Sequence, residues 1–485
     1  MIRIGKMSIA IFAMIISLIL LILGLGVKDV DVLMASVLVL FASVFLYSLF
    51  EGKKNIVFTA FLVCFFTFIL GEWGIKYLTG QEWKQIFDNK VIQHVLVCVY
   101  LSLFAIFLGV LCGNLKSKEN TMVDIELYKQ ENKKYENAIL VLFYITVVFN
   151  MAVVLEKVFF VQASTYIELY RTYSNTLPGM VYKLAECNDF MLYAFMTMLP
   201  DKKKAKLPLI IYFVIGVLSL FTGIRGTAVK VTILLIIYCL FRNTTDEEPW
   251  VKRKHIIIIC IAAPLAIVFL SLYNSWRSGL TANYTGFWTE FLNFFTTQGG
   301  SINVIAYEKV FHEMLPKTNT SYFFGPIISL YKHGFLGKII GGIFNQEFIE
   351  YAKNTIGDAL YGNNLGATIT YLVMPQRFLS GIGLGTQYIA EAYADFGYVG
   401  VAVFNFILGF LISKCKFVYF KKWYLNVFII YMIYSFLGIA RNFALNFLPV
   451  WISVWNWTLV MVILLLGKIR LKKYGGINDE GTVDM

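Results

Sequence analysis

The sequence predicts an all-α polytopic integral membrane protein with about 12 transmembrane helices, cytoplasmic N- and C-termini and one large extracytoplasmic loop. Hydrophobic residues make up 58% of the 485 residues, only 15% are charged, and the mean hydropathy is +0.69. A soluble protein of this length could not bury that much apolar surface. The apolar residues also gather into runs of roughly 20, the length that crosses a bilayer.

Twelve apolar runs are candidate transmembrane helices. The first follows Arg3 and Lys6 as a signal peptide would, but no small-residue cleavage site follows it, so we expect a retained helix. The sixth contains Glu186 and Asp189 and the eighth contains Lys230, which makes these two the least apolar. The runs cover residues 7–26, 31–50, 56–71, 91–112, 138–155, 180–199, 207–223, 228–241, 255–273, 390–412, 424–440 and 447–466.

Basic residues orient these runs. With the N-terminus inside, the clusters 202–204, 252–254 and 421–422 all fall on the cytoplasmic side, as the positive-inside rule predicts. An even number of spans also places the cluster at 468–473 inside. The net charge of +12 is therefore explained by membrane topology rather than by nucleic-acid binding.

This topology divides the chain into four parts. Residues 1–273 form a membrane domain with spans one to nine, and residues 390–466 form a second with spans ten to twelve. Residues 274–389 form the extracytoplasmic loop, in which apolar residues at helical spacing predict amphipathic and re-entrant helices. Residues 467–485 form a cytoplasmic basic segment followed by a tail that we expect to be disordered.

Two carboxylates lie where the tenth span enters the membrane. Glu391 and Asp395 are four residues apart, so on a helix they share one face. Ionisable groups at this depth are costly and usually functional, and one of these carboxylates would suit a general base. Solvated acids at a helix entry, or a Glu391 that pairs with an arginine, are the alternatives. His312 and His333 in the large loop are further candidate bases, although each could be structural.

Arginine is used sparingly, with nine arginines against 33 lysines. The guanidinium group grips phosphate oxygens through two parallel hydrogen bonds, so an outer cluster of arginines suits a lipid-linked phosphate or diphosphate. Snorkelling to lipid headgroups, or pairing with a nearby acid, is the alternative for each of them. Five arginines fall at the predicted outer face: Arg171, Arg225, Arg277, Arg377 and Arg441.

Arg225 is the most informative of the five. Gly223 and Gly226 flank it in a short turn before a helix, and a helix N-terminus beside an arginine can hold an anion. Arg277 and Arg441 come from other helix ends at the same depth, so the three could converge on one pocket. The sequence contains no ATP-binding P-loop, no serine-hydrolase elbow and no His/Cys metal-ligand set, so we expect no cofactor and no metal.

The sequence resembles the Wzy-type polymerases of O-antigen and capsular polysaccharide, which join oligosaccharide repeat units. Three stretches carry the resemblance: 222–226 (Thr-Gly-Ile-Arg-Gly), 276–279 (Trp-Arg-Ser-Gly), and 383–400, which contains Glu391, Tyr393 and the Phe-Gly-Tyr-Val-Gly sequence. The resemblance implies a glycosyltransferase of the bacterial cytoplasmic (inner) membrane with its active site on the extracytoplasmic side.

That resemblance also implies the substrates and partners. Donor and acceptor would both be oligosaccharides linked to undecaprenyl diphosphate, with the arginines holding the diphosphate and Glu391 activating the acceptor hydroxyl. Tyr393, Gly223 and Gly226 would support the site, and Asp395 and His312 are further catalytic candidates. Membrane lipid surrounds the protein, a flippase and a chain-length regulator are candidate partners, and no nucleic acid is expected.

Two other functions remain open from the sequence. An O-antigen ligase would carry a histidine-rich signature in the outer loop, of which only His312 keeps the option open. A flippase for lipid-linked sugars would tend to show two related halves and short loops, whereas these halves are unequal and one outer loop dominates.

Overall fold

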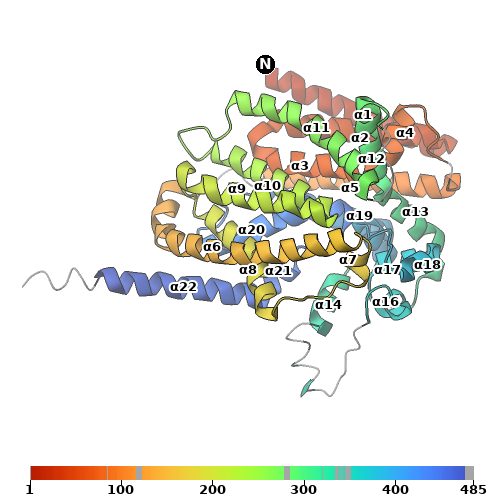
Figure 1. Cartoon of the computed structure of the whole chain (residues 1–485). Helices are drawn as coiled ribbons and strands as arrows, with labels where there is room; N and C mark the ends of the chain where they lie inside the picture. Colours follow the sequence, from red (N-terminus) through yellow and green to blue (C-terminus); the bar gives the residue numbers. More distant parts are fainter. Residues whose placement is uncertain are drawn as a thin grey trace, which may run out of the picture. The chain divides into compact units, whose positions relative to one another are not determined.

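In the computed structural model, the described part of the chain consists of helices joined by turns and loops and contains no β-strand (Figure 1). Among the described residues, eight helices are long and apolar enough to cross a membrane, and two shorter apolar helices, Trp423–Phe436 and Val454–Lys468, accompany them. Each of the twelve predicted runs overlaps a helix, while the count of twelve spans and the topology stay predictions. The structure describes all residues except 1, 85, 116–122, 278–283, 319–320, 334–336, 338, 340–341, 344–350 and 476–485; at 2–8, 53, 170, 274–277, 333 and 469–475 it describes the backbone alone.

The chain separates into two compact units, and the first contains the sequence motif around Glu391. Unit 1 comprises Met1–Lys118, Val251–Lys414 and Ser435–Pro449. Its helices are α1 (Ile2–Val27), α2 (Val30–Glu51), α3 (Ile56–Phe65), α4 (Gly71–Leu78), α5 (Asn89–Leu115), α11 (Arg253–Arg277), α12 (Phe287–Gln298), α13 (Ile302–Phe311), α14 (Gly325–His333), α16 (Ile356–Tyr361), α17 (Leu365–Val373), α18 (Pro375–Leu379) and α19 (Tyr388–Lys414).

Helices α5 and α19 pack with their backbones in close contact. A Cβ atom added to Gly109 on α5 would lie 2.0 Å from the carbonyl oxygen of Phe406, and one added to Gly409 on α19 would lie 2.0 Å from that of Ile106. Small residues bring membrane helices together in this way, because lipid tails leave close packing as the main source of attraction. This contact fixes α19 against the rest of unit 1.

Helix α19 is interrupted at Gly397, whose φ of 61° and ψ of −155° are not helical. This φ lies in the left-handed region that disfavours residues with a side chain beyond hydrogen. The residues before Gly397 carry Glu391 and Asp395, and the residues after it form most of the apolar part of the helix. The break therefore separates the polar part of the motif from the membrane-spanning part.

Unit 2 comprises Glu119–Trp250, Cys415–Tyr434 and Val450–Met485. A tyrosine cluster lies in its interior, where the Tyr193 ring packs against Tyr212 and Tyr431. Its elements are α6 (Ile125–Ala163), α7 (Glu168–Arg171), α8 (Gly179–Thr197), α9 (Lys202–Leu218), η3 (Ser219–Thr222), α10 (Arg225–Arg242), most of α20 (Trp423–Phe436), most of α21 (Pro449–Ile452) and α22 (Val454–Gly475). The predicted disordered tail begins in α22 and then passes outside the described residues.

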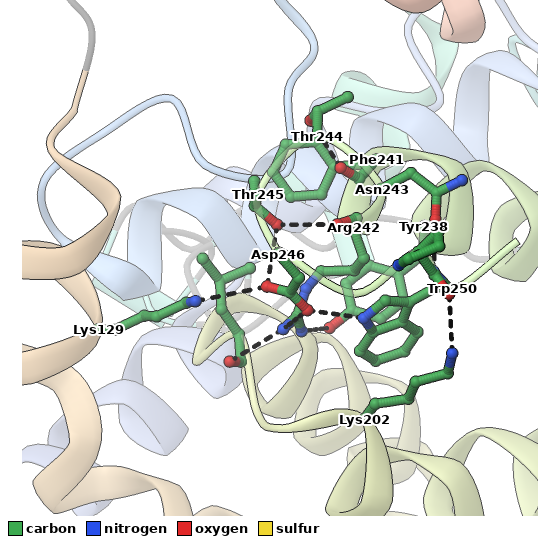
Figure 2. Close-up of polar contacts among 12 residues, drawn as sticks. Lys129, Lys202, Tyr238, Phe241, Arg242, Asn243, Thr244, Thr245, Asp246 and Trp250 are labelled. Atoms are coloured by element: carbon green, nitrogen blue, oxygen red, sulfur yellow. Dashed lines mark hydrogen bonds and ion pairs between the residues drawn. The ribbon is translucent and has the colours of Figure 1, made fainter.

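A buried arginine organises the end of α10 in unit 2 (Figure 2). The Arg242 side chain is 1% exposed and donates to the Asp246 carboxylate at 2.6 Å and to the Tyr238 hydroxyl at 2.8 Å. Its guanidinium group lies 4.5 Å from the Trp250 ring centre, and the Trp250 indole N–H also donates to Asp246. Burial alone would raise the pKa of Asp246, but Arg242 and the hydrogen bonds outweigh it and lower that pKa. Arg242 therefore fixes the loop that follows α10.

Candidate active site

Unit 1 contains a cavity of about 600 Å³. Helices α14, α16 and α17 contribute to its wall, together with the loop 383–386 and the turn that follows Arg441 (Figure 1). Its size is within the range of ligand-binding pockets. Because every lining residue belongs to unit 1, the cavity can be described within one compact body.

The lining of this cavity is polar and carries more positive than negative charge. Lys332, Lys353 and Arg441 contribute cations, and Asp358 is the single carboxylate among the lining residues that the structure describes. Five asparagines add amide donors and acceptors, and Tyr351 and Tyr361 stack on each other at 5.4 Å. Cations suit phosphate oxygens, amides suit sugar hydroxyls, and aromatic faces suit sugar rings. The lining therefore suits a charged glycan ligand.

Arg441 reaches the cavity from the short helix η6 (Ile439–Arg441). The guanidinium group is exposed, and one of its nitrogens donates to the side-chain oxygen of Gln298 at 3.3 Å. Gln298 ends α12, so this contact fixes Arg441 to a second element of unit 1. Of the four predicted arginines whose side chains the structure describes, Arg441 is the one in the cavity lining.

Glu391 lies behind the cavity wall. Its side chain is fully buried, and its two oxygens accept the hydroxyl of Thr386 at 2.5 Å and the backbone N–H of Ala444 at 2.8 Å. Thr386 lines the cavity, and Ala444 follows the lining residue Phe443. Glu391 therefore joins two segments of the wall, and it is not itself among the lining residues.

Asp395 anchors the segment that leads into α14. Its carboxylate accepts the Ser321 hydroxyl and the backbone N–H groups of Tyr322 and Phe323, the latter at 3.2 and 2.9 Å. The Ser321 carbonyl in turn accepts the side-chain amide of Asn363, a lining residue. Asp395, like Glu391, thus supports the cavity through backbone groups.

His312 belongs to a separate cluster. Its Nδ1 lies 2.6 Å from the carboxylate of Glu308 on α13, and its ring packs against Tyr393 at 5.9 Å. Glu308 is fully buried, and burial raises its pKa to about 7 although the neighbouring His312 and Lys309 oppose the shift. Neither His312 nor Tyr393 lines the cavity. The side chain of His333 lies outside the described residues.

The remaining predicted site residues lie elsewhere. Arg377 is exposed on α18, where the next residue, Phe378, lines the cavity instead. The side chain of Arg277 lies outside the described residues. Four of them belong to unit 2. Arg171 pairs with Glu168 at 3.2 Å, and Gly223, with a φ of 81°, follows η3. Arg225 and Gly226 are the first two residues of α10.

Sequence analysis did not single out Lys332, Lys353 or Asp358. The two lysines lie in the predicted outer loop, where positive charge is disfavoured, and this was the signal available for them. Asp358 lies three residues after Thr355, a spacing typical of a helix N-cap, and no sequence motif marks it as a site residue.

Comparison with known proteins covers nearly the whole chain. The family model described as O-antigen polysaccharide polymerase Wzy matches residues 9–474. No curated protein and no solved structure matches the sequence.

Proposed function

The chain belongs to the O-antigen polysaccharide polymerase Wzy family, and from that premise we propose that it joins oligosaccharide repeat units linked to undecaprenyl diphosphate. The growing glycan is transferred from one lipid diphosphate to the next lipid-linked unit at the outer face of the cytoplasmic membrane. The active site is the cavity of unit 1. The observation that supports this assignment best is the combination of three cations with amide and aromatic groups in one lining.

The cations serve the leaving group. When the bond between the anomeric carbon and the phosphate oxygen breaks, the departing diphosphate gains negative charge. Lys332, Lys353 and Arg441 stabilise that charge in the transition state. The contact with Gln298 already holds Arg441 in position. Arg441 can also grip two phosphate oxygens in parallel, which would orient the lipid diphosphate in the cavity.

The neutral groups serve the sugars. Asn442 and Asn446 lie beside Arg441 in the lining, so a sugar attached to the diphosphate would meet their amides first. Tyr351 and Tyr361 offer stacked aromatic faces on the α16 side of the cavity. Glu391 and Asp395 act as positioning residues, because they hold the segments that carry the cavity lining.

Extension of purified lipid-linked repeat units in vesicles tests this function. Wild-type protein should lengthen the glycan without a nucleotide sugar. Arg441→Ala and the double variant Lys332→Ala/Lys353→Ala should each extend units roughly 10–100-fold more slowly, since a hydrogen bond to a charged group is worth about 1.5–3 kcal/mol. Both should also bind undecaprenyl diphosphate more weakly.

Lys317→Ala is the matched control, because Lys317 is an exposed lysine of the same loop that does not line the cavity. Wild-type extension rates in both cavity variants would place the active site elsewhere. Movement of lipid-linked units across the membrane without any extension would instead identify a flippase.

A further inference from the structure

The cavity holds a carboxylate, Asp358, in its lining. Asp358 lies in the first turn of α16, where the Thr355 side chain caps the helix and accepts the backbone N–H of Asp358 at 3.2 Å. One oxygen, Oδ2, accepts the backbone N–H of Asn354 at 3.1 Å. The other oxygen, Oδ1, is oriented toward Gly362, since a Cβ atom added there would lie 2.7 Å from it. Gly362 and Asp358 both line the cavity.

The surroundings of Asp358 suit a proton acceptor. Burial raises the pKa of Asp358 above its ordinary value, and the Lys353 ammonium group opposes that shift without cancelling it. The other charged or titratable groups in the lining are Lys332, Arg441, Tyr351 and Tyr361. A carboxylate with a raised pKa holds a transferred proton better than an ordinary one, and this is the property required of a general base.

We propose that Asp358 is the general base that activates the acceptor sugar in this cavity. The assignment rests on the proposed polymerase function. Asp358 Oδ1 takes the proton of an acceptor hydroxyl, and the hydroxyl oxygen forms a bond to the anomeric carbon of the donor. The bond between that carbon and the phosphate oxygen breaks, and its electron pair leaves with the lipid diphosphate, which the three cations hold.

Asp358 fits this role better than Glu391. Both oxygens of Glu391 accept hydrogen bonds from the protein, and the side chain is fully buried behind the wall. A substrate hydroxyl could reach Glu391 only if Thr386 moved. Asp358 itself lines the cavity; its Oδ2 accepts the Asn354 N–H, and its Oδ1 faces Gly362, another lining residue.

If Asp358 served only to cap α16, the variants of this helix terminus would behave differently. An asparagine at position 358 keeps an oxygen that can accept the Asn354 N–H, so Asp358→Asn preserves the cap and removes only the base. Thr355→Val does the reverse, because it removes the cap acceptor of α16 and leaves the carboxylate in place. The pair of variants therefore separates chemistry from helix stability.

The experiment uses full-length protein in vesicles, with purified lipid-linked repeat units as substrate and undecaprenyl diphosphate as the binding probe. We expect Asp358→Asn to slow extension by about 100-fold or more, the usual contribution of a general base. Binding of the probe should stay within about twofold of wild type. The wild-type rate should fall as the pH is lowered, and Asp358→Asn should lose that dependence. Thr355→Val should lower thermal stability and keep the rate within about threefold.

Two failures can be told apart. Extension by Asp358→Asn at the wild-type rate, or an equal loss in Thr355→Val, refutes the assignment of Asp358 while the wild-type protein still extends units. A wild-type protein that extends no units at all refutes the proposed function, and the assignment of Asp358 with it.

Discussion

Replacing Glu391 tests whether this residue holds the cavity together. Glu391→Ala removes the carboxylate that accepts the backbone N–H of Ala444 and the hydroxyl of Thr386. Ala444 is fully buried. An unpartnered buried N–H costs about 1–3 kcal/mol, and the loss of the second hydrogen bond costs about 1 kcal/mol. The one buried methylene group that is lost adds about 0.8 kcal/mol. We therefore expect Glu391→Ala to lower the free energy of unfolding by about 3–5 kcal/mol.

Glu391→Gln should cost less, at about 1–3 kcal/mol, because the amide keeps one oxygen for one of the two donors. Unfolding can be followed in detergent by tryptophan fluorescence, with Glu313→Ala as the control for an exposed glutamate of unit 1. A positioning role predicts that Glu391→Gln retains part of the extension activity. The reasoning fails if Glu391→Ala is as stable as wild type. It also fails if Glu391→Gln is fully stable yet inactive, since that result would make Glu391 a chemical participant.

Two further predictions concern unit 1. Gly109→Ala forces α5 and α19 apart by about 1 Å at the Phe406 carbonyl and should lower the free energy of unfolding by about 1–3 kcal/mol. Gly26→Ala is the control and should not lower it, because nothing lies within 4 Å of the added Cβ atom. Equal stability of the two variants would contradict the close helix contact. Glu308 has a pKa of about 7 when folded and an ordinary value of 4.5, so between these values the folded protein keeps a proton that the unfolded chain releases. Stability should therefore rise by about 2 kcal/mol as the pH falls from 7.5 to 5.5. Glu308→Gln should lose that rise in a pH series of unfolding curves, and an unchanged rise would assign it to another group.

Much of the fold could be predicted from hydropathy and from the spacing of apolar residues. Each apolar run predicted from the sequence overlaps a helix, because a bilayer imposes a minimum length and composition that a single chain displays openly. The segments of the predicted outer loop before α19 were harder to predict. They pack as short helices around a cavity, and which of their faces turns inward depends on partners distant in sequence, such as Ser321 and Asp395.

The candidate site residues were likewise only partly predictable from the sequence. Arg441 was recognisable from its type and depth, and it lines the cavity. Glu391 was recognisable as an unusual carboxylate, but its contact with Ala444 is made across 53 residues of sequence and could not be foreseen. Asp358 carries no motif in the sequence, and only the tertiary structure brings it into the lining of the cavity.

The break at Gly397 also affects how the length of α19 fits the thickness of a bilayer. An unbroken helix of 27 residues would measure about 40 Å, longer than the roughly 30 Å of hydrocarbon that it has to cross. Because the backbone turns at Gly397, the surplus need not tilt the spanning half. The half before Gly397 can follow the residues around the cavity, while the half after it matches the thickness of the bilayer.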